Sequence, residues 1–109
     1  MIKGKAKLEF GTGTIGMCPC INEDGVAALC LATCDPHEIG KLEPMPSGWT
    51  PEQSEVIMTF TKPESVEALI AELSDIYTQM CSFKATGKMP DEHWGHTMIV
   101  NYDLFMEDK

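Results

Sequence analysis

The chain has 109 residues, with 17 acidic against 8 basic side chains and a formal net charge of -9 at pH 7. It contains no arginine, the residue best suited to bidentate phosphate contacts, and its charge opposes approach to a phosphate backbone. Composition therefore excludes direct nucleic-acid binding, and no stretch approaches the ~18 apolar residues that span a bilayer. Because the first residues also lack a signal-peptide pattern, we expect a cytoplasmic protein folded as a single domain with no membrane contact.

Residues 2–10 alternate between apolar side chains and a row of lysines. A period of two is typical of a half-exposed strand. We therefore predict a first strand here, and the glycines within residues 11–13 predict a turn after it.

Residues 13–34 predict a β-hairpin around the sequence NEDG. Asn22 suits the start of a type I turn, and Gly25 suits the left-handed position that ends a three-residue loop. The register counted back from this turn places Cys18 opposite Cys30. Because side chains alternate, one hairpin face is apolar and the other combines small residues with four of the five cysteines, which are Cys18, Cys20, Cys30 and Cys34.

Pro19 adds a constraint on the neighbours of this hairpin. In the predicted register its nitrogen, which carries no hydrogen, points away from the second hairpin strand. We therefore predict either that residues 13–21 form a sheet edge or that their pairing with the first strand is interrupted at Pro19.

Residues 35–54 contain four prolines and two glycines and predict a long loop. Met45 and Trp49 are large apolar residues within it, and they either pack on the core or form a contact patch for a partner. With the neighbouring acids, they give a candidate partner-binding set of Met45, Trp49, Glu52 and Glu55.

A strand at 55–61 and a helix at 63–84 follow. The apolar residues of the helix recur at spacings of three and four, so one stripe is expected to face the sheet. A final strand is predicted at 97–106. The order ββββαβ predicts an α+β fold with a mainly antiparallel sheet of about five strands and one amphipathic helix packed on one face.

The clustered cysteines are candidate metal ligands, with zinc as the candidate metal. Cys34 is four residues beyond Cys30, or roughly 13 Å along a strand, which is too far to share one zinc with Cys18 and Cys20. A site of Cys18, Cys20 and Cys30 completed by His37 remains. The alternatives are a thiol pair between Cys18 and Cys30, and a structural face on which cysteine acts as a small buried apolar residue.

Catalytic motifs are not recognisable, so the sequence leans against an enzyme, and His93 with His96 in a loop gives only a weak metal signal. We expect a non-catalytic protein-binding or regulatory module that forms a homodimer, because one helix covers only one face of a sheet. One version is an acidic mimic of nucleic acid, which requires a single face to carry Glu52, Glu55, Glu64, Glu67 and Asp75. The alternative function is metal- or thiol-dependent binding of a small ligand on the face of Cys18, Cys20 and Cys30.

Overall fold

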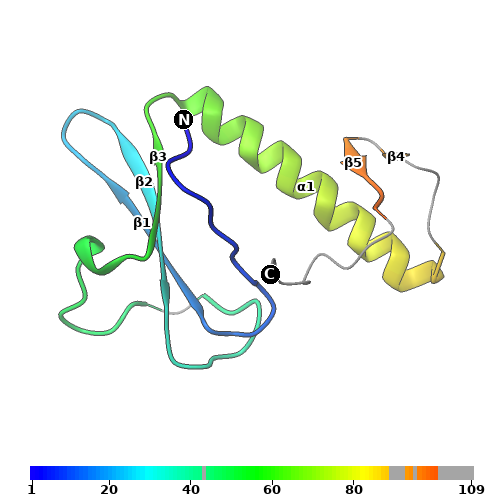
Figure 1. The fold of residues 1–109 in the computed structure, drawn as a ribbon, viewed down its shortest axis with the longest axis horizontal. Helices are drawn as coiled ribbons and strands as arrows, with labels where there is room; N and C mark the ends of the chain where they lie inside the picture. The colour runs from blue at the N-terminus through cyan, green and yellow to red at the C-terminus, as the bar shows by residue number, and fades with distance from the viewer. Residues whose placement is uncertain (43, 89–92, 95, 101–109) are drawn as a thin grey trace. The chain divides into compact units, whose positions relative to one another are not determined.

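The computed structural model describes residues 1–42, 44–88, 93–94 and 96–100. Contacts divide the chain into two compact units, residues 1–62 and residues 63–109. The first unit holds a three-stranded sheet, and the second holds a long helix and a short two-stranded hairpin (Figure 1). The class is therefore α+β, and each unit is described by itself.

The sheet begins with an antiparallel hairpin of β1 (Ile15–Ile21) and β2 (Ala27–Thr33). The N–H of Asn22 donates to the carbonyl of Val26 at 3.0 Å, and the N–H of Gly25 donates to the carbonyl of Asn22 at 3.1 Å. Gly25 has a φ of 80°, the left-handed conformation that the turn requires. The resulting pairing is the one predicted from the turn, with Cys18 opposite Cys30 and Cys20 opposite Ala28.

The third strand, β3 (Val56–Phe60), pairs antiparallel with β2. The strand order is β1-β2-β3, so β2 is central and β1 is an edge. Pro19 lies opposite Leu29 on this edge strand, where a missing N–H leaves no ladder bond unmade. The first of the two outcomes predicted from Pro19 is therefore confirmed.

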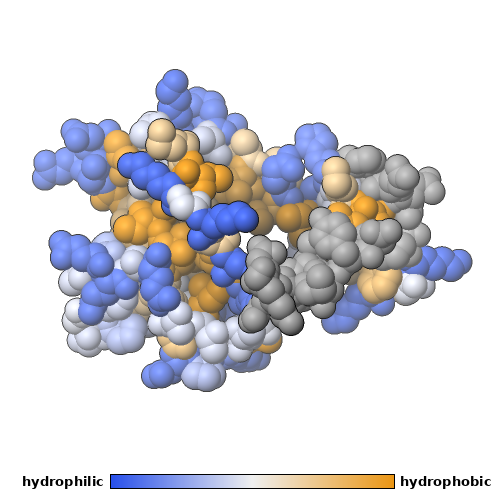
Figure 2. Space-filling view, viewed as in Figure 1, coloured by the Kyte–Doolittle hydropathy of each residue, from blue (hydrophilic) through white to orange (hydrophobic). Residues whose placement is uncertain are grey.

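The most buried residues lie in the central strand. The solvent-exposed fraction is 2% for Cys30, 3% for Leu31 and 6% for Ala32. Leu31 belongs to the apolar face, whereas Cys30 and Ala32 belong to the small-residue face, so both faces of β2 are covered at its centre. Toward the turn the cover ends, and Ile21 is 74% exposed. Apolar surface on this unit is visible between hydrophilic side chains in Figure 2.

The predicted first strand at residues 2–10 is wrong, because this segment has no strand structure. Its alternating pattern reads as a strand, yet Gly4 has a φ of 81°, which breaks an extended conformation. Pro19 also removes a donor from the edge of β1 that such a strand would use. Instead, residues 6–9 line a cavity with the apolar face of the sheet, where Leu8 is half-buried and Ala6 stays exposed.

Residues 35–50 form no helix or strand in the part of them that the structure describes, and a single 3-10 turn, η1 (Pro51–Gln53), leads into β3. The second unit begins with α1 (Pro63–Thr86), which starts at the predicted proline. It ends where the N–H of Gly87 donates to the carbonyl of Phe83 at 2.7 Å. No helix in the described ranges is long and apolar enough to cross a membrane.

A short antiparallel pair of β4 (His93–Trp94) and β5 (Thr97–Met98) follows the helix. The predicted final strand at 97–106 is thus shorter than expected, because residues 99 and 100 have left the strand, and 101–106 lie outside the described residues. The order is βββαββ with three strands in the main sheet, so a five-stranded sheet is not confirmed. Packing of the helix on a sheet face stays a prediction.

Candidate functional site

Three of the predicted ligands lie together on the small-residue face of the sheet. The sulfur of Cys20 is 3.9 Å from that of Cys18 and 4.0 Å from that of Cys30. The turn accounts for this grouping, because it sets Cys18 opposite Cys30 and leaves Cys20 two residues along the same strand face. All five cysteines of the chain are free thiols.

The surroundings of Cys20 oppose a reactive thiolate at this residue. Partial burial, together with hydrogen bonds to the thiols of Cys18 and Cys30, raises the pKa of Cys20 to about 11. The thiolate is the form that attacks electrophiles and binds metals. At neutral pH Cys20 therefore remains a protonated thiol, which suits a packed sheet face better than redox chemistry.

His37 does not join the cluster to which the sequence assigned it. Its Nδ1 lies 3.5 Å from the sulfur of Cys34 and 3.5 Å from the carbonyl oxygen of Asp35. In the described ranges, no group of three or more His, Cys, Asp or Glu side chains is arranged to hold a metal ion. Cys34 and His37 are three residues apart in the sequence, with a proline between them, and this short spacing could have predicted their contact. The predicted ligand set of Cys18, Cys20, Cys30 and His37 left Cys34 out.

The small-residue face is covered at one end by the chain's own loop. A Cβ built on Gly16 would lie 2.8 Å from the sulfur of Met45 and 3.5 Å from that of Cys34. Met45 is half-buried in this position, and Trp49 is half-buried as well. Of the two predicted fates for these apolar residues, packing within the unit accounts for Met45, and its role in partner binding stays a prediction.

The two acids of the predicted partner-binding set differ in their surroundings. Glu52 is exposed in η1. Glu55 accepts a hydrogen bond from the backbone N–H of Thr33 at 2.7 Å, and this bond lowers the pKa of its carboxyl. Glu55 thus joins the end of β2 to the start of β3, a structural task that its place in the sequence did not reveal.

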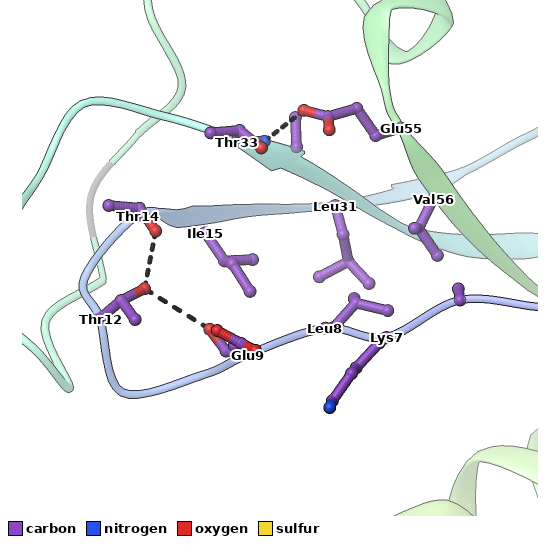
Figure 3. A pocket seen from close by; sticks show the side chains of 12 residues that line it. Lys7, Leu8, Glu9, Thr12, Thr14, Ile15, Leu31, Thr33, Glu55 and Val56 are labelled. Carbon is purple, nitrogen blue, oxygen red and sulfur yellow. Dashed lines mark hydrogen bonds between the residues drawn. The ribbon is translucent and has the colours of Figure 1, made fainter. Parts of the chain in front are cut away.

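A cavity of about 480 Å³ lies between the N-terminal segment and the apolar face of the sheet (Figure 3). Leu8, Ile15, Leu31 and Val56 give it an apolar floor. Polar groups gather at its rim, where the hydroxyls of Thr12 and Thr14 are 2.6 Å apart and Glu55 bonds to Thr33. Sequence reasoning did not find this cavity, because it depends on where an irregular segment crosses the sheet.

The helix α1 carries a stripe of exposed apolar side chains. None of its residues is buried. Six members of the stripe are about half exposed or more: Ile70 (57%), Leu73 (56%), Ile76 (46%), Tyr77 (69%), Met80 (67%) and Phe83 (46%). Within the described residues of its own unit, little covers this apolar stripe.

Beside this stripe, a polar cluster attaches the β4–β5 hairpin to the helix. The Asp75 carboxylate accepts hydrogen bonds from the N–H of His96 at 2.8 Å, the hydroxyl of Thr97 at 2.7 Å and the amide of Gln79 at 3.2 Å. The Nδ1 of His96 lies 2.7 Å from a carboxylate oxygen of Glu72. Asp75 is therefore engaged within the unit, and His96 contacts Glu72 of the helix; the predicted metal pair of His93 and His96 involves a His93 side chain outside the described part of the structure.

This cluster makes the attachment of the hairpin depend on pH. The bond from Thr97 chiefly lowers the pKa of Asp75, so its stabilisation is present above 3.8 and is lost as pH falls through the lowered value. The bond to Glu72 raises the pKa of His96, so that stabilisation is present below 6.5 and is lost as pH rises through the raised value. Attachment should be strongest between these limits, by a small margin because His96 is exposed.

We expect an NMR titration to give His96 a pKa above 6.5, and Glu72→Gln to bring it down toward the ordinary histidine value. Glu67→Gln, which removes another exposed acid of the same helix, is the matched control and should leave the pKa of His96 almost unchanged. An equal effect of both substitutions would mean that general helix charge, and not contact with Glu72, sets the titration.

With this geometry in view, the chain was compared with known proteins. No protein-family model, no curated protein sequence and no solved structure matches it.

Proposed function

We propose that this chain is a non-catalytic protein-binding module that works as a homodimer and uses the apolar stripe of α1 as its interface. The observation that carries the proposal is the exposure of the stripe, since no residue of a 24-residue helix is buried. Helices in proteins owe most of their stability to packing of an amphipathic face. In this proposal the stripe, which the sequence predicts to face the sheet, faces a protein partner instead, and closed two-fold pairing is the commonest form that such association takes.

The chemistry of the remaining surface supports a protein partner over a nucleic acid. The chain carries a net charge of -9 and no arginine, so a phosphate backbone would be repelled. We further propose a cytoplasmic location, supported by five free thiols that a reducing compartment would preserve. In the acidic-mimic version, Glu55 and Asp75 are held by internal hydrogen bonds, which leaves Glu52, Glu64 and Glu67 as its remaining exposed acids.

The alternative is a metal- or thiol-dependent ligand site on the face of Cys18, Cys20 and Cys30. The sulfur separations of 3.9 and 4.0 Å favour it. The raised pKa of Cys20 and the contact of His37 with Cys34 weigh against it. We therefore place this function second to dimerisation.

The substitution Ile76→Asp tests the proposed function. In a dimer the change occurs twice, and each copy would lose the burial of an isoleucine, worth about 1.5–3 kcal/mol, and would place a charge in an apolar interface. We expect the dissociation constant measured by analytical ultracentrifugation to rise by about 100-fold or more.

Thr78→Asp is the matched control, because Thr78 lies on the same helix away from the stripe and also exchanges a β-branched residue for aspartate. It should change the dissociation constant little. Circular dichroism of both variants shows whether the helix is retained. A wild-type chain that sediments as a monomer, or an Ile76→Asp chain that associates as well as wild type, would contradict the proposal.

A further inference from the structure

The apolar stripe of α1 has the spacing of a helix–helix seam. Its central residues alternate by three and four positions, which are the a and d positions of a heptad repeat: Val66, Leu69, Leu73, Ile76, Met80 and Phe83. The side chains of Leu73, Ile76, Met80 and Phe83 are each 46–67% exposed. The side chains of a facing helix can fill an a/d seam of this spacing, so the repeat suits a helical occupant.

We propose that α1 pairs with the α1 of a second copy of this chain in antiparallel orientation, with the two-fold axis between Ser74 and Asp75. This inference rests on the proposed function, because it specifies the interface and the orientation of that dimer. Three features of the helix support it. They are the pairing of the a and d residues in successive layers, the residues at the e and g positions beside the seam, and the distribution of charge along the helix.

The a and d residues of the seam are arranged symmetrically about the middle of the helix. In an antiparallel pair each a residue lies opposite a d residue, and an axis between Ser74 and Asp75 sets Leu73 opposite Ile76 of the second copy. The same axis sets Leu69 opposite Met80 and the small Val66 opposite the large Phe83. It also coincides with the middle of α1, which runs from Pro63 to Thr86, so the two helices would pair over their full length.

The flanks of the seam select the orientation. Ile70 and Tyr77 occupy e positions and are 57% and 69% exposed, whereas Glu72 and Gln79 occupy g positions. In antiparallel pairs e faces e and g faces g, so Ile70 would meet Tyr77 of the second copy, and no apolar e position would face a polar g position. A parallel pair would instead set e beside g and bring Tyr77 against Glu72, which is an apolar group against a charge.

The charges of α1 favour the same orientation. Its four acids, Glu64, Glu67, Glu72 and Asp75, lie at positions 64–75, and Lys84 lies in its last turn. A parallel pair would place the acidic ends side by side. An antiparallel pair would separate Glu64 of the two copies by roughly 30 Å, at 1.5 Å per residue, and would bring each acidic end toward Lys84. The helix dipoles would also oppose each other favourably.

In the described part of the second unit, the hairpin is bonded to one flank of this interface. His96 and Thr97 bond to Glu72 and Asp75, which lie on the g side of the seam. On the e side, Ile70 and Tyr77 are 57% and 69% exposed. The second helix would therefore approach over the a, d and e positions, opposite the flank to which the hairpin is bonded.

The orientation can be tested in the full chain by replacing Phe83 with the photocrosslinker p-benzoylphenylalanine, an aromatic residue of related shape. Unlabelled protein and nitrogen-15-labelled protein are mixed before irradiation. Mass spectrometry then separates crosslinks between copies, which join an unlabelled peptide to a labelled one, from crosslinks within one copy. We expect most crosslinks to join position 83 to residues 62–70 of the other copy. A second probe at Met80, expected to reach the region of Leu69, keeps the test open if the Phe83 variant fails to fold.

The outcomes separate this inference from the proposed function. Crosslinks from position 83 to residues 80–87 of the other copy would overturn the antiparallel orientation and leave the dimer standing. A monomer without crosslinks between copies would overturn both, as would crosslinks from position 83 to the sheet of the same copy. The same probe placed at Thr78, away from the seam, is the matched control and should lose the crosslinks between copies.

Discussion

Replacing Leu31 with alanine is expected to lower the free energy of unfolding of the sheet unit by about 2–5 kcal/mol. Leu31 lies in the central strand, is 3% exposed and pairs with Met17 on one side and Val56 on the other. Its side chain also forms part of the floor of the 480 Å³ cavity. Truncation would remove contacts from both neighbouring strands and enlarge a hollow that is already present, so little of the loss can be recovered by collapse.

The matched control is Ile21→Ala on the same sheet face. Ile21 is 74% exposed near the turn, so its truncation should change the free energy of unfolding by about 0.5 kcal/mol or less. Urea denaturation followed by fluorescence measures both variants. Similar losses at the two positions would show that the buried centre of β2 is not the core of this unit.

The substitution Gly13→Ala is expected to destabilise the same unit by about 2–5 kcal/mol, from left-handed strain and steric overlap together. Gly13 has a φ of 74°, and its carbonyl accepts a hydrogen bond from the N–H of His37 at 2.8 Å. A Cβ at this position would overlap the carbonyl oxygen of His37. Because the obstacle is backbone, the loop that starts at residue 35 would have to move away from the hairpin.

Gly11→Ala separates the two contributions. Gly11 also has a positive φ, at 111°, but a Cβ there meets no atom within 4 Å in the described structure. It should therefore show the backbone strain of about 1–2 kcal/mol without the overlap. If the two variants unfold at the same urea concentration, the contact between Gly13 and His37 contributes nothing to stability.

The hairpin was the part of the fold most open to prediction, because its information is local. Asn22 and Gly25 set the turn, the turn set the register, and the register placed Cys18 opposite Cys30. Pro19 likewise marked the sheet edge through its missing N–H. In each case the deciding atoms lie within a few residues of one another in the sequence.

The failures concern segments whose structure depends on distant residues. Residues 2–10 alternate like a strand, yet the edge they would join lacks a donor at Pro19, and residues 6–9 line the cavity over the sheet instead. The predicted final strand ends at Met98, in a two-residue pairing with β4. A period of two reports which side chains are apolar, and does not report whether a free strand edge is available.

The candidate site was predictable in composition and less so in its contacts. The sequence brought Cys18, Cys20 and Cys30 to one face, and their sulfurs do meet. It assigned His37 to the same group, whereas the loop carries His37 to Cys34. It gave no sign that Glu55 would join two strands or that Asp75 and Glu72 would hold a hairpin, since the partners lie more than twenty residues away in each case.

By itself the sequence determined the turn and register of the hairpin, the start of α1 at Pro63, and the apolar stripe along that helix, because each follows from local geometry and periodicity. Only the tertiary structure decided that the N-terminal segment stays out of the sheet, that Met45 covers Gly16, and that no residue of α1 is buried. The physical reason is that burial and pairing depend on which surfaces meet across long chain separations. A periodic pattern identifies an apolar surface without identifying what covers it.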